Sequence, residues 1–161
     1  MSQQTKAFLT VISVLLTSAF IGGLANNSPI ELSCENPKEI DIKFILLRNT
    51  SVFSLILVGY LTYGVLSISL LAFNGFILGY LLNSRPYILA LKLVIPHGVF
   101  ELTGFILISY ISLLSSFRLR RSHDPLVVLC YKKYIILSYI LLVIGALVEW
   151  KITPYIACGV M

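Results

Sequence analysis

Charged residues are scarce in this chain. Asp, Glu, Lys and Arg make up 12% of its 161 residues, whereas hydrophobic residues make up 58%. A soluble domain carries roughly 25% charged residues, so this composition excludes a soluble globular protein and a disordered one. Heptads are absent, which excludes a coiled coil, and three cysteines are too few for a disulfide scaffold. The composition therefore predicts an integral membrane protein of the all-α, polytopic class.

The short motifs of common catalytic and nucleotide-binding sites are also missing. The chain has no glycine-rich phosphate loop, no CxxC, no HExxH and no GxSxG. We therefore expect no enzymatic activity and no cofactor. The net charge of +5 is interpreted through membrane topology, because in a chain this apolar it does not indicate nucleic acid.

Five apolar segments are predicted to enter the bilayer. They are residues 7–25, 50–72, 74–95, 98–117 and 132–150, within a single membrane domain that covers the whole chain. A complete span of about 20 residues matches a hydrocarbon core of roughly 30 Å. For the first segment we expect a retained helix, and the alternative is a cleaved signal peptide with small residues at 23–25.

Two helix breaks are predicted within these segments. Residues 49–84 carry no charge, but about 36 residues are too few for two full spans and a turn, so we expect one span followed by a break at Asn74-Gly75. A second break is expected where Pro96 and Gly98 flank His97. The segment 74–95 would then be broken or re-entrant.

The charges of the two polar segments predict the orientation. Residues 26–43 are mainly acidic, with Glu31, Glu35, Glu39 and Asp41, whereas residues 118–133 carry Arg118, Arg120, Arg121, Lys132 and Lys133. The positive-inside rule places the basic loop in the cytoplasm. An odd number of crossings then gives a multi-pass protein of the cell membrane with a cytoplasmic N-terminus and an outside C-terminus. A disulfide between Cys34 and Cys158 would be compatible with this orientation.

Three ionisable residues inside the predicted spans are the candidate functional residues. His97 and Glu101 are four residues apart, which places them on one face of a helix, and Glu149 lies near the outer end of the last span. Three interpretations compete: a polar clasp that fixes helix packing, a transport or proton-relay site, and a metal site. Because no second His lies inside the bilayer, we favour the clasp and expect no metal. His123 lies in the basic loop and is interpreted as a solvated residue.

Glycine spacing predicts one close helix contact. Gly75 and Gly79 form a GxxxG motif in an apolar context, and such spacing lets two helix backbones approach closely. The contact is either within the chain or between two copies of it, in a homo-oligomer.

Four pieces of sequence resemble the stage II sporulation protein M family of prokaryotic membrane proteins. They are Asn49 after an aliphatic run, residues 73–79 around Asn74-Gly75, residues 95–102 with Pro-His-Gly-x-x-Glu, and residues 146–154 around Glu149. The resemblance covers about 44–156. It implies about five membrane segments and marks His97, Glu101 and Glu149 as a recurring polar element.

The functions that this resemblance implies belong to membrane complexes. The name-giving members act with peptidoglycan-degrading proteins during engulfment in sporulating bacteria, and others are connected with maturation, export or self-immunity of circular bacteriocins. The resemblance carries no enzymatic activity over to this chain. We therefore expect a non-catalytic scaffold or subunit whose basic loop contacts anionic lipid or a partner such as a transporter ATPase. The alternatives are a small transporter or permease subunit that uses a broken helix with His97 and Glu101, and an intramembrane metal-dependent enzyme.

Overall fold

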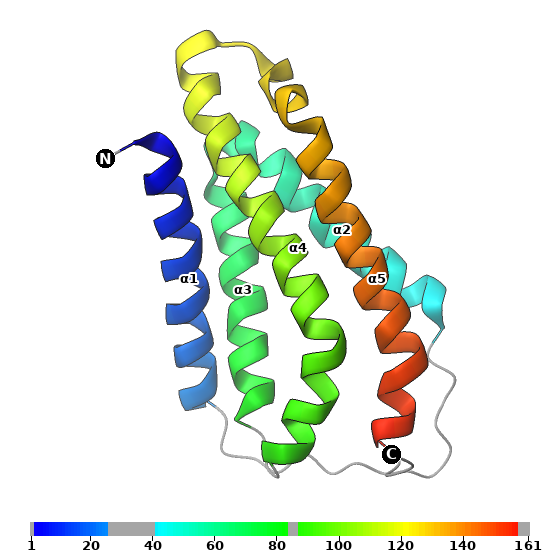
Figure 1. Ribbon diagram of the computed structural model, residues 1–161. Helices are drawn as coiled ribbons and strands as arrows, with labels where there is room; N and C mark the ends of the chain where they lie inside the picture. Colours follow the sequence, from blue (N-terminus) through cyan, green and yellow to red (C-terminus); the bar gives the residue numbers. More distant parts are fainter. Residues whose placement is uncertain (1, 26–40, 84–86, 158–161) are drawn as a thin grey trace.

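The computed structural model describes residues 2–25, 41–83 and 87–157, which form five long helices (Figure 1). These are α1 (Gln3–Ala25), α2 (Ile42–Val58), α3 (Val65–Leu82), α4 (Tyr87–Ser122) and α5 (Lys132–Ala157), with short 3-10 helices η1 (Gly59–Thr62) and η2 (Pro125–Tyr131). Five helical stretches of the described chain are long and apolar enough to cross a membrane. The predicted all-α polytopic fold is therefore confirmed.

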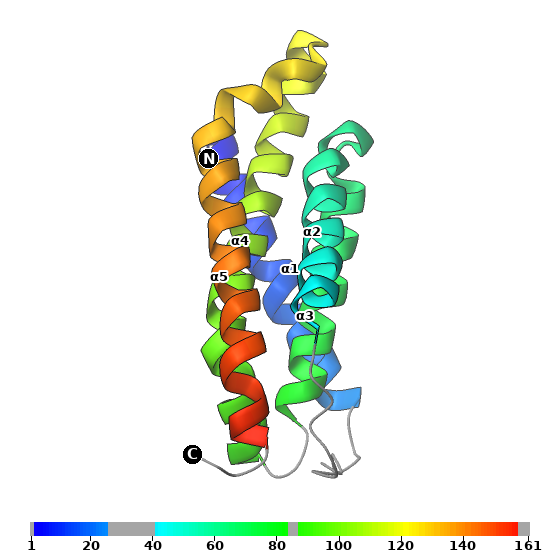
Figure 2. The same cartoon turned by 90° about the vertical axis from the view of Figure 1, so that its right-hand side faces the viewer.

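The helices run alternately up and down, so that the two ends of the chain lie at opposite ends of the bundle (Figure 1). The most extensive helix contacts are those of α4 with α5 and of α1 with α3. In both views, the connection from α4 through η2 to α5 extends further along the bundle than the turn between α2 and α3 does (Figures 1 and 2). The start of α1 lies toward this same end of the bundle.

The predicted single span 50–72 is wrong, because the chain reverses inside it. Tyr63 and Gly64 take left-handed backbone angles, with φ of 55° and 87°, and separate α2 from α3. The prediction failed because α2 begins already at Ile42, where the carboxylate of Asp41 accepts a hydrogen bond from the Lys43 backbone N–H at 2.9 Å. Two shorter helices therefore fit where one span and a break were expected.

Neither predicted helix break occurs. Asn74 and Gly75 lie inside α3, where the Asn74 side chain donates to the carbonyl of Leu70 at 2.8 Å. Pro96 and Gly98 lie inside α4, which is continuous over 36 residues, so the segments 74–95 and 98–117 do not exist as separate units. Opening a helix in hydrocarbon would leave several backbone groups without partners, which costs more than the one hydrogen bond that proline removes.

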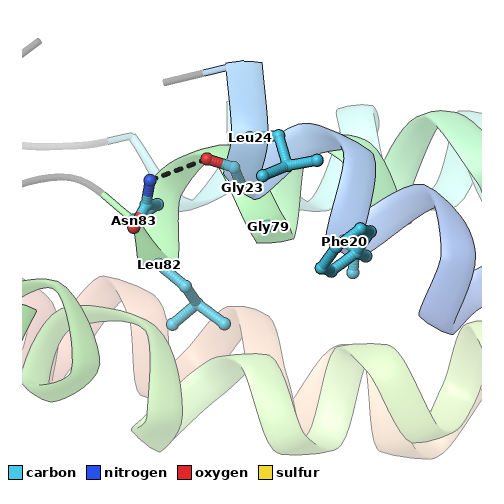
Figure 3. Close-up of a pocket in the computed structure, with 7 residues that line it drawn as sticks. Phe20, Gly23, Leu24, Gly79, Leu82 and Asn83 are labelled. Atoms are coloured by element: carbon cyan, nitrogen blue, oxygen red, sulfur yellow. Dashed lines mark hydrogen bonds between the residues drawn. The ribbon is translucent and has the colours of Figure 1, made fainter. Parts of the chain in front are cut away.

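The glycine motif of α3 forms a tight contact with α1, as the spacing predicts, and the contact lies within one chain. A Cβ at Gly79 would overlap the backbone of Ala19, and a Cβ at Gly75 would lie 3.0 Å from the carbonyl oxygen of Leu15. Figure 3 shows the end of this contact, where Asn83 Nδ2 donates to the carbonyl of Gly23 at 2.7 Å beside a groove of about 390 Å³.

Small residues also bring α5 against α4. Ser138 is buried and its hydroxyl donates to the carbonyl of Gly104 at 2.6 Å. A Cβ at Gly104 would lie 2.9 Å from the backbone oxygen of Ser138. This close packing continues along α5 to Gly145 and Glu149, where the polar residues meet.

The structure does not test a disulfide between Cys34 and Cys158. Cys130 is a free, exposed thiol in η2. Cys34 and Cys158 lie outside the described residues.

Candidate functional site

The three ionisable residues singled out in the sequence come together between two helices. His97 and Glu101 lie one turn apart on α4, and Glu149 lies on α5. One nitrogen or oxygen atom from each side chain lies within 4.8 Å of the corresponding atoms of the other two, and all three residues are partly buried. These residues are called the polar cluster below.

A glycine one turn before Glu149 allows this convergence. A Cβ at Gly145 would meet Cγ of Glu101 and would lie 3.2 Å from the backbone oxygen of His97. The α5 backbone therefore runs directly against the turn of α4 that carries the histidine and the first glutamate. A larger residue at 145 would push the Glu149 side chain away from its neighbours.

A third helix contributes to the cluster through Asn49. This residue of α2 is only 3% exposed, and its Nδ2 donates a hydrogen bond to Oε1 of Glu101. The neighbouring Arg48 donates through Nε to Oδ1 of Asn49 at 3.4 Å. This bond holds the Arg48 guanidinium beside Asn49, so α2 supplies both an amide and a positive charge.

The hydrogen bonds of His97 and Glu101 differ from those expected. We expected the two side chains to bond each other, but Glu101 accepts from Asn49 and Nδ1 of His97 lies 3.4 Å from the hydroxyl of Thr153. Bonds across three helices replace the local pair because each side chain faces a neighbouring helix. Polar contacts between α2, α4 and α5 thus take the place of a local pair within α4.

Sequence reasoning missed Asn49, Thr153 and Gly145 as parts of the site. Asn49 was named for the family resemblance, but it lies just before the span predicted to start at 50 and was not assigned to the site. Its α2 neighbours Ile45 and Phe53, one turn away on either side, are both buried. This helical spacing of apolar residues was the available signal that Asn49 faces the protein interior.

Glu149 has an unsatisfied oxygen. Its Oε2 is buried and makes no hydrogen bond within the part of the chain that the structure describes. A carboxylate oxygen without a partner is costly in apolar surroundings. The cluster can lower this cost chemically in two ways, by sharing a proton between the carboxylates or by binding a cation.

Pro96 and Gly98 lie beside the cluster, in the same turns of α4 as His97, whereas the predicted basic residues lie away from it. The five basic residues of 118–133 are all exposed at the end of the α4–η2–α5 connection, called the basic tip below. Two of them cover tyrosine rings: the guanidinium carbon of Arg118 lies 5.0 Å from the ring centre of Tyr131, and that of Arg120 lies 4.9 Å from that of Tyr63.

Comparison with known families gives a match over most of the chain. The family described as stage II sporulation protein M matches residues 7–154. The chain belongs to the stage II sporulation protein M family. The match starts in the second turn of α1 and includes the polar cluster and the basic tip. It therefore extends further toward the N-terminus than the region 44–156 that carried the resemblance.

One relative of this family member comes from an archaeon. An uncharacterised protein of Methanocaldococcus jannaschii is 34% identical over 130 residues, which cover 70% of this chain and 71% of the relative. No solved structure matches the chain. Membership in the stage II sporulation protein M family thus fixes a multi-span membrane protein and leaves its specific role to be proposed.

Proposed function

We propose that the protein is a non-catalytic subunit or scaffold of a membrane complex and that the basic tip is its contact with a cytoplasmic partner. The membrane complexes that the family resemblance implies, in envelope remodelling or in bacteriocin maturation, export and immunity, support this role. The observation that carries it is the shape and chemistry of the tip.

The tip presents charge and apolar surface together. Leu126 and Leu129 of η2 are 63% and 58% exposed, and they lie in sequence between Arg121 and Lys132, two exposed basic residues. At 1.5 Å per residue, α4 is about 54 Å long, which exceeds a bilayer core of roughly 30 Å. An apolar centre with a charged rim is typical of a protein-binding surface.

Several contacts hold the tip in place. The hydroxyl of Tyr60 donates to the carbonyl of Pro125 at 2.7 Å, and the carboxylate of Asp124 accepts from the Leu126 backbone N–H at 2.8 Å. The cation–π contact of Arg120 with Tyr63 ties the end of α4 to the α2–α3 turn. A surface that is already ordered loses less entropy on binding.

The positive charge of the tip supports a cytoplasmic location. The termini lie at opposite ends of the bundle (Figure 1), so we propose a cytoplasmic N-terminus and an outside C-terminus. A partner with an acidic face suits this surface, and we propose a transporter ATPase as that partner.

Cross-linking through Cys130 tests the proposal. In membranes from the native host, a photoreactive group on this exposed thiol should give one discrete adduct with another protein, and the mildly solubilised chain should migrate above its own 17.9 kDa. Arg121→Glu with Lys133→Glu should abolish both signals, whereas Lys43→Glu, at the other end of the bundle, should retain them. A chain that migrates alone, forms only self-adducts, or keeps its adduct in the double variant would overturn the proposal.

Two features of the sequence favoured a transporter, and the structure retains one of them. The helix break at Pro96 is absent, since α4 is continuous, but a polar cluster between α4 and α5 remains. If His97→Gln with Glu101→Gln abolished the cellular role of the protein while leaving its complex intact, the transporter would become the better proposal.

A further inference from the structure

We propose that His97, Glu101 and Glu149 bind a divalent transition-metal ion of the zinc class between α4 and α5. The donor set is one imidazole nitrogen and two carboxylate oxygens. Imidazole suits zinc and its neighbours in the first transition row, whereas Mg²⁺ and Ca²⁺ prefer sites made only of oxygen. A site with three protein ligands leaves one position of a tetrahedral ion for a small additional ligand.

The distances within the cluster fit this ion after a small adjustment. Ligand atoms bound to Zn²⁺ at about 2 Å in a tetrahedral arrangement lie roughly 3.3 Å from one another. The three candidate atoms already lie within 4.8 Å of one another. The gap to close is therefore at most about 1.5 Å, which glutamate side chains can cover by rotation about their χ angles.

The unsatisfied oxygen of Glu149 points to a missing partner. Among the residues that the structure describes, its Oε2 is buried without a hydrogen bond, although Glu101 and His97 beside it both have polar partners. Most buried polar atoms in native proteins are satisfied. A cation at the centre of the cluster would satisfy this oxygen without moving a helix.

The charge of the ligands suits a divalent ion. Two ionised carboxylates carry two negative charges, which the two positive charges of such an ion balance. Arg48 supplies a further positive charge nearby, and its Nε donates to Asn49.

The surrounding hydrogen bonds leave suitable atoms for binding. Asn49 occupies Oε1 of Glu101, so Oε2 is the oxygen left for the ion. The hydroxyl of Thr153 lies beside Nδ1 of His97, so Nε2 is the nitrogen left for it. Orientation of metal ligands by such neighbouring hydrogen bonds is common in natural metal sites.

Metal titration of the purified full-length chain tests the site. Untagged protein in detergent is stripped with a chelator and titrated with Co²⁺, whose visible spectrum reports low-symmetry binding, and with Zn²⁺ by calorimetry. We expect one ion per chain, together with a higher unfolding temperature. Glu149→Gln or His97→Gln should weaken binding at least tenfold, whereas His123→Gln, which removes the exposed histidine of the tip, should bind as the wild type does.

A measurement on the unmodified protein covers the case in which variants fail to fold. X-ray absorption at the zinc edge should show imidazole nitrogen and carboxylate oxygen at about 2.0–2.2 Å and no sulfur. A sulfur ligand, no binding by the wild type, or full binding by Glu149→Gln would overturn the proposal. None of these outcomes bears on the complex proposed above, because the metal would hold the helices together whether or not the tip binds a partner.

Discussion

Replacing Gly79 by alanine tests how tightly α1 and α3 are packed. A Cβ at this position would lie 2.8 Å from Cα of Ala19, whereas ordinary contacts of a Cβ lie at 3.4–4 Å. The atoms of Ala19 that the new Cβ would meet all belong to the backbone. No side chain can therefore rotate away, and α1 itself must move. Overpacking of this kind costs about 1–3 kcal/mol, and we take the upper value because the obstacle is rigid.

The opposing effect on helix stability is smaller. Alanine is favoured over glycine inside a helix by about 1 kcal/mol, so Gly79→Ala should destabilise the protein by about 2 kcal/mol. At about 2–4 °C per kcal/mol for a domain of this size, its unfolding temperature in detergent should fall by about 4–8 °C. Gly79→Leu should be worse, and worse than Leu81→Phe, a change at a more exposed position of α3.

Gly98→Ala is the matched control, because it is also a glycine inside a membrane-spanning helix. Within the described part of the chain, its added Cβ would meet only Cγ1 of Val94, at 3.2 Å, a side-chain atom of the same helix. This variant should therefore keep the wild-type unfolding temperature or exceed it. If Gly79→Ala were as stable as Gly98→Ala, the backbone of α1 would not limit the size of the residue at position 79. The packing argument would then be refuted.

Three further predictions concern two hydrogen bonds and the orientation of the chain in the membrane. Asn49→Ala should cost about 1.5–3 kcal/mol, typical of a hydrogen bond to a charged group, because Glu101 loses its donor, whereas Thr50→Ala should cost less in the same thermal assay. In a variant that keeps Cys130 alone, an impermeant thiol reagent should label inside-out vesicles but not intact cells, and the reverse pattern would invert the proposed orientation. Ser138→Ala should lower stability by about 1 kcal/mol, as measured by thermal unfolding, and an unchanged value would show that its hydrogen bond to α4 adds nothing.

The class of fold could be predicted from composition, but the helix boundaries could not. Five membrane-crossing helices follow from the long apolar stretches, whereas Asn74-Gly75 and Pro96 were interpreted by rules that hold in water. In water an opened helix exchanges its hydrogen bonds for bonds to solvent, but in hydrocarbon it has no such replacement. The real reversal at Tyr63-Gly64 contains a glycine in a left-handed conformation, and the assumed length of a span placed this glycine inside one helix.

The three ionisable residues of the candidate site were predictable, but their hydrogen-bond partners were not. Ionisable residues in an apolar chain are few, so His97, Glu101 and Glu149 could be selected from the sequence and expected to converge. Which partner each side chain contacts depends on how α2 and α5 are rotated toward α4. That rotation is fixed by glycine contacts such as Gly145 against Glu101, which the sequence alone does not reveal.

The polar contacts matter most for α2, because lipid gives helices no hydrophobic reason to associate. The pairs α1–α3 and α4–α5 are held by close backbone approach at glycines. Helix α2 is attached differently: Asn49 bonds Glu101 of α4, and Ser67 of α3 donates to the Ile56 carbonyl of α2 at 2.8 Å while lying 2.6 Å from Ser112 of α4. Loss of the polar cluster should therefore loosen α2 from α4 while leaving the glycine contact of α1 with α3 intact.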